Sequence, residues 1–323
     1  MKSKIILVVN GEPNSIFSEI FIKSLKKIKL KTPIIYIYSE KLLKIQMKKL
    51  KINKKIKLIN LSQIKSYKLD NKSINLINID YSQKKAFKKI SNNSAKFIKE
   101  SFDTAFKIIK KEKIYKFING PISKKHFLNK KYLGITEYIS EYFSKKNTCM
   151  LIFNKKLSVC PVTTHLPLAL ISKKINQKDI ENKIVLIQNF YKKILNKKPR
   201  IALLGLNPHC ETILRKNEDQ QIISPVVKKM KKNGYKINGP IPSDTAFIKD
   251  NRKNYDVIIG LYHDQVLTPI KTLFEYDAIN ITLGLPFIRI SPDHGPNEKM
   301  LGKNISSPLS LIQTLNFVNK FDN

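Results

Sequence analysis

The chain is poor in glycine, cysteine and arginine, and it has no tryptophan. Its 323 residues include 10 glycines, and none of them falls in a Gly-x-Gly-x-x-Gly segment, which excludes the ordinary dinucleotide-binding fingerprint. The three cysteines, Cys149, Cys160 and Cys210, form no Cys-x-x-Cys pair and cannot all be paired with one another. This pattern favours a reduced, cytoplasmic setting.

Long hydrophobic runs are absent as well. No apolar stretch reaches the roughly 18 residues that suggest a membrane span, so we expect no membrane partner. The short apolar stretch from Ile5 to Val9 leads into Asn10-Gly11 without a small-residue cleavage pattern. It predicts a first β-strand instead of a secretory signal.

Acidic residues are scarce: 24 Asp and Glu stand against 61 Lys and Arg, for a net charge of +37. A basic nucleic-acid-binding protein is one interpretation, and it predicts an affinity that falls steeply with salt. However, the excess is almost entirely lysine spread along the chain, whereas nucleic-acid readers generally use arginine. We therefore favour a compositional origin in an AT-rich genome and expect no nucleic-acid partner. Phosphorylated small molecules would still benefit from the positive field.

Short β-branched runs alternate with longer amphipathic stretches throughout the chain. The expected strands are Lys4–Val9, Pro33–Tyr38, Ser73–Ile79, Tyr115–Ile118, Cys149–Phe153, Leu157–Val162, Arg200–Leu204, Tyr255–Gly260 and Ala278–Thr282. The expected helices include Ile16–Ile28, Asn93–Lys110, Thr136–Lys145, Asp179–Leu195, Gln220–Lys232 and Pro308–Phe321. The Lys- and Ile-rich stretch 41–72 has little turn punctuation and yields no firm element. The alternation predicts an α/β protein with a largely parallel sheet.

Three of the five histidines follow strand-like runs directly. His165 comes after Leu157–Val162, His209 after the run ending at Leu204, and His263 after the run ending at Gly260. Loops beyond the carboxyl ends of parallel strands meet at one edge of a sheet, and neutral imidazole suits zinc and related divalent metals. A single histidine in such a place is more often a surface or hydrogen-bonded residue, and the spacing matches no metal signature. Three in the same context indicate a candidate metal site.

Several sequence motifs resemble those of the 4-hydroxythreonine-4-phosphate dehydrogenases, the PdxA family of vitamin B6 biosynthesis. The motifs match those of the family in order and spacing from about Asn119 to Gly295. They are Asn119-Gly-Pro-Ile-Ser-Lys124, Gly134-Ile-Thr-Glu-Tyr138, Val162-Thr-Thr-His-Leu-Pro-Leu168, Gly205-Leu-Asn-Pro-His209, Asn238-Gly-Pro-Ile-Pro-Ser-Asp-Thr245, Tyr262-His-Asp-Gln265, Pro269-Ile-Lys271, Asn280-Ile-Thr-Leu-Gly-Leu-Pro-Phe-Ile-Arg289 and Ser291-Pro-Asp-His-Gly295.

The resemblance implies a fold, a reaction and partners. The fold is a two-lobed α/β/α architecture of the isocitrate/isopropylmalate dehydrogenase type. One lobe would comprise residues 1–125 plus 285–323, and the other, residues 126–284, would carry the metal-ligand loops and dimer contacts. The reaction is oxidation and decarboxylation of 4-phosphohydroxy-L-threonine to 3-amino-2-oxopropyl phosphate, with NAD or NADP and one divalent ion (Zn, Mg or Co). The family is homodimeric, with the active site completed across the interface.

The resemblance also implies roles for individual residues. Metal ligands would be His165, His209 and His263, and substrate contacts would be Thr136, Lys271, Asn280 and Arg289. We assign catalytic roles to Lys271 and Asp244. Asp244 and Asp264 are suited to orienting metal ligands through hydrogen bonds. A role in a turn or helix cap explains the presence of both aspartates equally well.

This chain departs from the family pattern in three places. Ile135 stands where the family has a histidine before the threonine, and an apolar side chain cannot replace that hydrogen bond. The glycine-rich segment expected after His209 is replaced by Cys210–Asn217, which has no glycine, and the N-terminal Gly-Asp-Pro appears as Gly11-Glu-Pro. Glycines in such loops let backbone approach a ligand closely. Because of these departures, an alternative interpretation stays open: the chain is a sister dehydrogenase that acts on another phosphorylated hydroxy acid, such as a threonate phosphate.

Overall fold

A computed structural model describes residues 3–61, 64, 67–128, 131–132, 134–210, 217–275, 277–292 and 294–320. The chain divides into two compact units: unit 1 is Met1–Ile139 with Pro286–Asn323, and unit 2 is Ser140–Leu285. The described residues from His126 to Ile139 therefore fall in unit 1 and Leu285 falls in unit 2, whereas the resemblance implied the opposite for both. The physical reason is aromatic packing, since the rings of Phe127 and Tyr138 both lie on Phe102.

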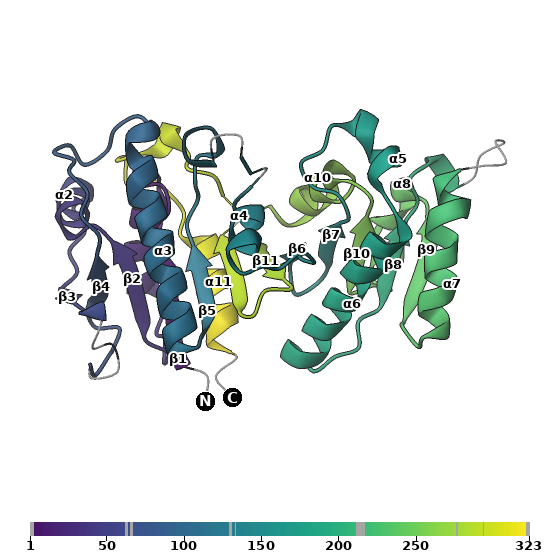
Figure 1. Cartoon of the computed structure of the whole chain (residues 1–323), viewed down its shortest axis with the longest axis horizontal. Coiled ribbons are helices and arrows are strands. Elements are labelled where there is room, and N and C mark those ends of the chain that lie inside the picture. The colour runs from purple at the N-terminus through teal and green to yellow at the C-terminus, as the bar shows by residue number, and fades with distance from the viewer. Residues whose placement is uncertain are drawn as a thin grey trace. The chain divides into compact units, whose positions relative to one another are not determined.

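Unit 1 is built on parallel strands with helices packed against them (Figure 1). The strand order is β3 (Ile56–Leu58), β4 (Ile74–Asn78), β2 (Ile34–Tyr38), β1 (Ser3–Val9), β5 (Ile114–Asn119), β12 (Ile288–Pro292). The described neighbouring pairs within this order are all parallel. The helices are α1 (Phe17–Lys27), α2 (Glu40–Leu50), α3 (Ala95–Glu112) and α11 (Leu309–Asn319), and α4 (Ile135–Tyr142) begins in unit 1 and ends in unit 2. Strand β2 is buried along its whole length, as expected for a parallel strand covered by helices.

Helix α3 illustrates how the sequence builds this layer. Phe97, Phe102 and Phe106, with Ile98 and Ile109, recur at helical spacing and form its buried face. That face packs on β1 and β5, and Figure 1 shows α3 running across the sheet. The helix therefore exists because one apolar stripe is buried against the strands.

Unit 2 combines a parallel core with an antiparallel edge. Its strand order is β11 (Ile279–Leu283), β6 (Cys149–Phe153), β7 (Ser158–Pro161), β10 (Val257–Gly260), β8 (Ile201–Leu204), β9 (Ile237–Ile241). β6 is antiparallel to both of its neighbours, whereas β7, β10, β8 and β9 are mutually parallel. The helices are α5 (Ile171–Lys174), α6 (Gln177–Ile194), α7 (Ser224–Lys232), α8 (Ser243–Ala246), α9 (Lys249–Arg252) and α10 (His263–Phe274).

The expected α/β class with largely parallel strands is confirmed, and each expected strand and helix coincides with an observed element within a few residues. Phe321, the expected end of the last helix, lies outside the described residues. The helices and strands absent from the expectations are α2, β3, α5, β9, α8, α9, α10 and β12. Two of them contain a proline before their last residue: β9 includes Pro240 and α10 includes Pro269. Proline normally argues against the interior of a strand or helix, which hid both elements.

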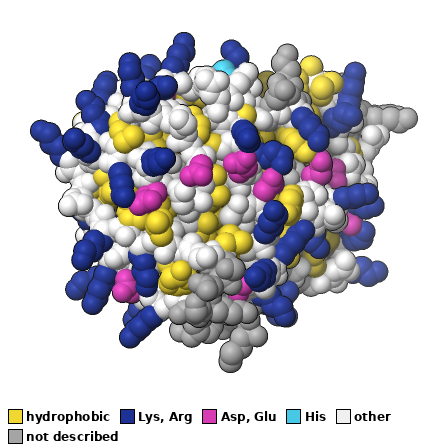
Figure 2. All heavy atoms as spheres, turned by 60° about the vertical axis from the view of Figure 1, so that its left-hand side comes forward, with side chains coloured by type: hydrophobic (Ala, Val, Ile, Leu, Met, Phe, Trp, Pro, Cys, Tyr) yellow, Lys and Arg dark blue, Asp and Glu magenta, His cyan; other side chains and the backbone are white. Residues whose placement is uncertain are grey.

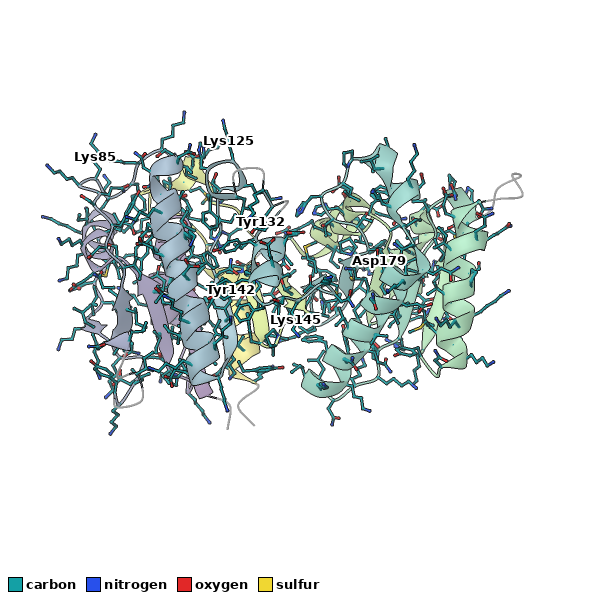
Figure 3. The ribbon with its side chains drawn as sticks, viewed as in Figure 1. Lys85, Lys125, Tyr132, Tyr142, Lys145 and Asp179 are labelled. Carbon is teal, nitrogen blue, oxygen red and sulfur yellow. The ribbon has the colours of Figure 1, made fainter. Side chains whose placement is uncertain are left out.

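Basic side chains are distributed over the face that Figure 2 draws. Figure 2 shows Lys and Arg side chains scattered over one face, with Asp and Glu among them, instead of gathered in one patch. In Figure 3 the exposed Lys85 and Lys125 lie on the outside of unit 1. Within the part of the chain that the structure describes, no helix has the length and apolar character needed to cross a membrane.

Candidate functional site

The three histidines singled out in the sequence follow three adjacent strands of unit 2. β7, β10 and β8 are neighbours and run parallel, so their carboxyl ends meet at one edge of the sheet. His165 follows β7, His263 is the first residue of α10 after β10, and His209 follows β8. The rings of His165 and His263 have centroids 6.0 Å apart. The topology therefore brings two of the three imidazoles side by side.

One of these histidines is oriented by a neighbouring carboxylate. His263 Nδ1 lies 2.6 Å from Asp264 Oδ1, and the His263 side chain is 36% exposed. A bond at Nδ1 fixes the ring and directs the lone pair of Nε2 outward, which is the usual arrangement behind a metal-ligating histidine. Asp264 thus has the geometry for the orienting role considered from the sequence.

The loop that carries His209 has an unusual backbone. His209 lies in the short 3-10 turn η5 (Pro208–Cys210) with φ 58°, in the left-handed region, and its side chain is exposed. The buried Asp219 holds the start of this loop, because its carboxylate accepts hydrogen bonds from Leu206 N at 2.7 Å and Asn207 N at 3.1 Å. Of the glycine-free segment 210–217, residues 211–216 lie outside the described residues.

The described side chains do not by themselves form a complete metal centre. In the described part of the chain, no group of three or more His, Cys, Asp or Glu side chains is placed to hold a metal ion. Two imidazoles on one ion at about 2.0–2.1 Å have ring centres roughly 5 Å apart, so His165 and His263 lie near that spacing. The His165 and His263 rings lie about 1 Å farther apart than that spacing, so the metal role of the three histidines stays a prediction.

Two further predicted residues of unit 2 have burial that suits a ligand. The Oδ1 atom of Asn280, on β11, is buried and has no hydrogen-bond partner among the described residues. A buried unsatisfied acceptor costs free energy, so a native structure usually reserves it for a partner such as a bound molecule. Lys271, on α10, is half-buried, and burial lowers the pKa of its ammonium group. Asp244 is exposed on α8.

The remaining predicted residues, Thr136 and Arg289, meet in unit 1. Arg289, on β12, is 1% exposed, and its Nε donates to Asn119 Oδ1 at 2.7 Å. Its Nη1 donates to Thr136 Oγ1, on α4, at 3.3 Å. Burial lowers the pKa of Arg289 to about 10, while the charge of Glu137 opposes that shift. The guanidinium thus stays charged at neutral pH and is held in one orientation beside the first turn of α4.

Ile135, the residue that replaces the family histidine, is the first residue of α4. It is partly exposed and precedes the Thr136 that Arg289 contacts. Glu137, next along, has a buried Oε2 with no hydrogen-bond partner among the described residues. The first turn of α4 therefore combines a helix N-terminus, a hydroxyl and a nearby guanidinium, which attract an anionic group, with the carboxylate of Glu137, which repels one.

Sequence reasoning missed a buried carboxyl in the loop after β1. Glu12 is fully buried, with Oε1 accepting from Asn14 N at 3.1 Å and Oε2 accepting from Ser94 Oγ at 2.9 Å. Burial raises the pKa of Glu12, and its hydrogen bonds oppose this. Glu12 N donates to Pro121 O at 2.8 Å, which ties this loop to the one that follows Asn119. The Gly11-Glu-Pro motif drew attention to this loop, but the sequence alone does not show that the Glu12 carboxyl is buried.

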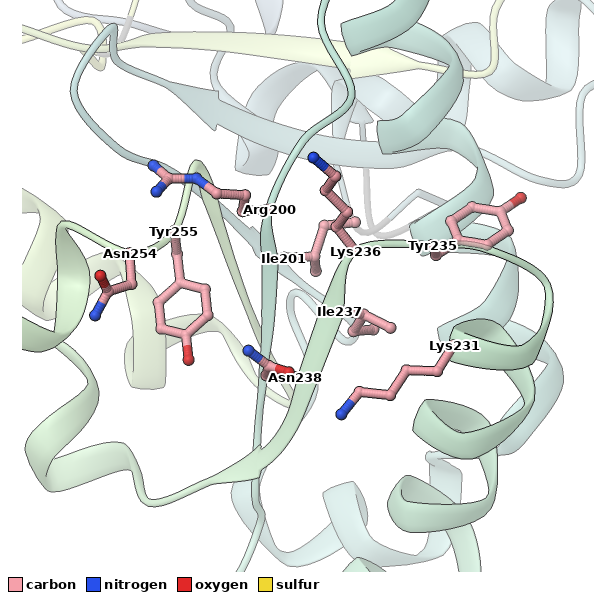
Figure 4. A pocket seen from close by; sticks show the side chains of 9 residues that line it. All are labelled: Arg200, Ile201, Lys231, Tyr235, Lys236, Ile237, Asn238, Asn254 and Tyr255. Atoms are coloured by element: carbon pink, nitrogen blue, oxygen red, sulfur yellow. The ribbon is translucent and has the colours of Figure 1, made fainter.

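A basic pocket of unit 2 lies away from all of these residues (Figure 4). It has a volume of about 350 Å³ and is formed where β8, β9 and β10 begin, not where they end. Its lining is Arg200, Ile201, Lys231, Tyr235, Lys236, Ile237, Asn238, Asn254 and Tyr255. None of the predicted site residues lines it, so it is separate from the histidine edge.

Comparison with known proteins decides the family. Residues 29–318 match the model of the family described as pyridoxal phosphate biosynthetic protein PdxA. The chain belongs to the PdxA family. A 4-hydroxythreonine-4-phosphate dehydrogenase of Sulfurihydrogenibium sp. (strain YO3AOP1) is 38% identical over 312 residues, covering 94% of each chain. A D-threonate 4-phosphate dehydrogenase of Salmonella typhimurium is 29% identical over 306 residues, covering 91% of this chain and 92% of that one.

Solved structures agree with the PdxA assignment and with the expected fold. The 4-hydroxythreonine-4-phosphate dehydrogenase of Klebsiella pneumoniae is 28% identical, with a TM-score of 0.83 and 98% of both chains covered. An isocitrate dehydrogenase from Methylococcus capsulatus aligns with a TM-score of 0.50 at 9% identity, over 97% of this chain and 84% of that one, which bears on the fold alone. This PdxA-family chain therefore has the isocitrate dehydrogenase-like fold expected from its sequence.

Proposed function

We propose that this PdxA-family chain oxidises and decarboxylates 4-phosphohydroxy-L-threonine to 3-amino-2-oxopropyl phosphate, as a step of pyridoxal 5'-phosphate formation. The observation that carries the proposal is the placement of His165, His209 and His263 after three adjacent parallel strands, in a chain of this family. The hydroxyl carbon loses a hydride to a nicotinamide cofactor, NAD or NADP. The resulting β-keto acid then loses CO2. No glycine-rich dinucleotide turn occurs in the sequence, so we assign no residue to the cofactor.

We assign the metal to the histidine edge of unit 2. His165, His209 and His263 would hold it, with Asp264 orienting His263 through the 2.6 Å bond at Nδ1. A bound divalent cation such as Zn, Mg or Co supplies Lewis acidity toward the substrate hydroxyl. The near approach of the His165 and His263 rings and the chemistry of three neutral imidazoles support this assignment.

The other site residues bind and orient the substrate. Asn280 would use its Oδ1, which has no hydrogen-bond partner among the described residues, to accept a hydrogen bond from the substrate. Lys271, whose pKa is lowered by burial, would contact an anionic group and accept or return a proton near neutral pH more readily than an ordinary lysine. Arg289 and Thr136 would attract the phosphate or carboxylate to the first turn of α4. Asp244 would orient a ligand from its exposed position on α8.

A homodimer would complete the site. Leu168 is 70% exposed and Ile248 is 54% exposed. Leu168 lies three residues beyond His165, and Ile248 lies close along the chain to Asp244. Both side chains are therefore available to pack against a second copy of the chain. A second copy packed there would supply the ligand geometry that one chain lacks, as the family resemblance implies.

The decisive experiment measures NADH or NADPH formation from 4-phosphohydroxy-L-threonine, with and without added divalent metal. D-threonate 4-phosphate is the competing substrate, because a relative with that activity covers most of the chain. Turnover of the first substrate with a kcat/KM well above that of the second supports the proposal. The reverse preference would assign the chain to the threonate phosphate reaction.

Restoring the family residue by Ile135→His should lower KM for 4-phosphohydroxy-L-threonine by roughly ten- to a hundredfold. The reason is that a charge-assisted hydrogen bond contributes on the order of 1.5–3 kcal/mol. Ile135 is partly exposed at the start of α4, so an imidazole there need not be buried. KM, metal affinity and Tm should be measured on the same variant, with Ile135→Gln as a polar control. A lower Tm with no gain in KM would show that the loop has been rebuilt around the isoleucine.

A further inference from the structure

One side chain of unit 2 contacts loops from three neighbouring strands. Gln265, in the first turn of α10, accepts a hydrogen bond from Leu261 N at 2.6 Å through Oε1. Its Nε2 donates to Gly205 O at 2.7 Å and to Ser243 Oγ at 2.7 Å. Gly205 follows β8, Ser243 begins α8 after β9, and Leu261 follows β10. We call Gln265 with these three residues the loop clamp.

A fourth loop is attached to the clamp through its backbone. Leu261 O accepts hydrogen bonds from Thr163 N at 3.1 Å and Thr163 Oγ1 at 2.7 Å. Thr163 lies in the loop after β7 that carries His165. The clamp therefore links the loops of all three predicted metal ligands and, through Ser243, the loop of Asp244.

The local sequence makes room for this arrangement. A Cβ added at Gly260 would lie 2.9 Å from Gln265 Oε1 and 2.5 Å from Val266 Cγ1. A Cβ added at Gly205 would lie 2.5 Å from Cys210 Sγ. Separations under 3 Å are steric clashes, so a side chain at Gly260 would displace Gln265, and one at Gly205 would displace Cys210. Both glycines thus serve close packing around the clamp.

We propose that Gln265 is a positioning residue that sets the spacing of the loops carrying His165, His209 and His263. The proposal rests on the metal role given to those histidines in the proposed function. A glutamine suits the task because one amide supplies an acceptor for the β10 loop and donors for the β8 and β9 loops. Residues that hold metal ligands in place through hydrogen bonds typically lower metal affinity or activity 10–100-fold when they are substituted.

The test uses Gln265→Glu in the full-length protein. The substitution keeps the acceptor for Leu261 N, and its second carboxylate oxygen can still accept from the Ser243 hydroxyl. It faces Gly205 O without a donor, however, so the link to the β8 loop is lost. We expect Co²⁺ to bind about 10–100-fold more weakly, and kcat to fall with little change in KM. The matched control is Gln177→Glu, since Gln177 Nε2 donates to Gln221 O at 3.1 Å in the same unit.

Each outcome decides the proposal. Parental Co²⁺ affinity and kcat in Gln265→Glu would overturn it. If that variant does not fold, Ser243→Ala replaces it. Co²⁺ binding is expected to weaken by about threefold in Ser243→Ala, because one hydrogen bond of the clamp is lost. Unchanged Co²⁺ binding would again overturn the proposal.

The metal role and the clamp can fail separately. If the parent protein binds no Co²⁺, the metal role in the proposed function fails. The loop clamp is then tested by the rate of amide hydrogen exchange. Faster exchange in the 163–165, 205–209 and 261–263 segments of Gln265→Glu than of Gln177→Glu supports the clamp. Equal exchange refutes it.

Discussion

Replacing Arg289 by lysine is expected to reduce kcat/KM for 4-phosphohydroxy-L-threonine at least about tenfold, which corresponds to 1.4 kcal/mol. A lysine keeps the charge, but its ammonium cannot donate to Asn119 Oδ1 and Thr136 Oγ1 with the geometry of a planar guanidinium. The anion-binding turn of α4 would lose its oriented partner. Steady-state kinetics on the purified variant measure the effect.

The same substitution should also lower stability, because Arg289 is buried and leaves Asn119 Oδ1 without its donor. An unmatched buried acceptor costs about 1–3 kcal/mol. Arg252→Lys is the matched control, since Arg252 Nη1 donates to Phe247 O at 2.8 Å in unit 2 and has no proposed substrate role. A lower Tm with an unchanged kcat/KM would show that Arg289 is structural.

Removing divalent metal should lower the rate of NADH formation at least about a hundredfold, and adding the metal back should restore it. The estimate follows from a Lewis-acid contribution of several kcal/mol, since each 1.36 kcal/mol is tenfold in rate. His263→Ala should show a comparable loss that added metal does not rescue, because a ligand nitrogen is missing. Metal content and activity should be measured on the same preparation.

His126→Ala is the control for this experiment. His126 belongs to unit 1, where its Nδ1 lies 2.7 Å from Asn92 Oδ1, and it has no proposed role at the metal. It should retain metal and activity. Full activity in a chelator-treated, metal-free protein would contradict the metal role of the three histidines.

Part of the site could be predicted from the sequence because its residues lie in local patterns. His165, His209 and His263 each follow a run of apolar residues, and such runs form buried parallel strands whose loops meet at one edge. Arg289 was predicted because its sequence motif resembles that of the PdxA family, and it is one of only four arginines in the chain. The role of Gln265 could not be predicted, although it lies beside His263, because its three partners come from loops tens of residues apart in the chain.

Hydrophobic periodicity and turn residues alone determined the α/β class and the extent of most strands and helices, because these depend on short-range patterns of apolar residues. Only the tertiary structure decided that β7, β10 and β8 are neighbours, that Glu12 and Arg289 are buried, and that Phe127 and Tyr138 pack on Phe102 of unit 1. Those properties depend on contacts between segments far apart in sequence, where burial and hydrogen bonding select one arrangement among many. The sequence could place the site residues along the chain, but folding decided which of them meet.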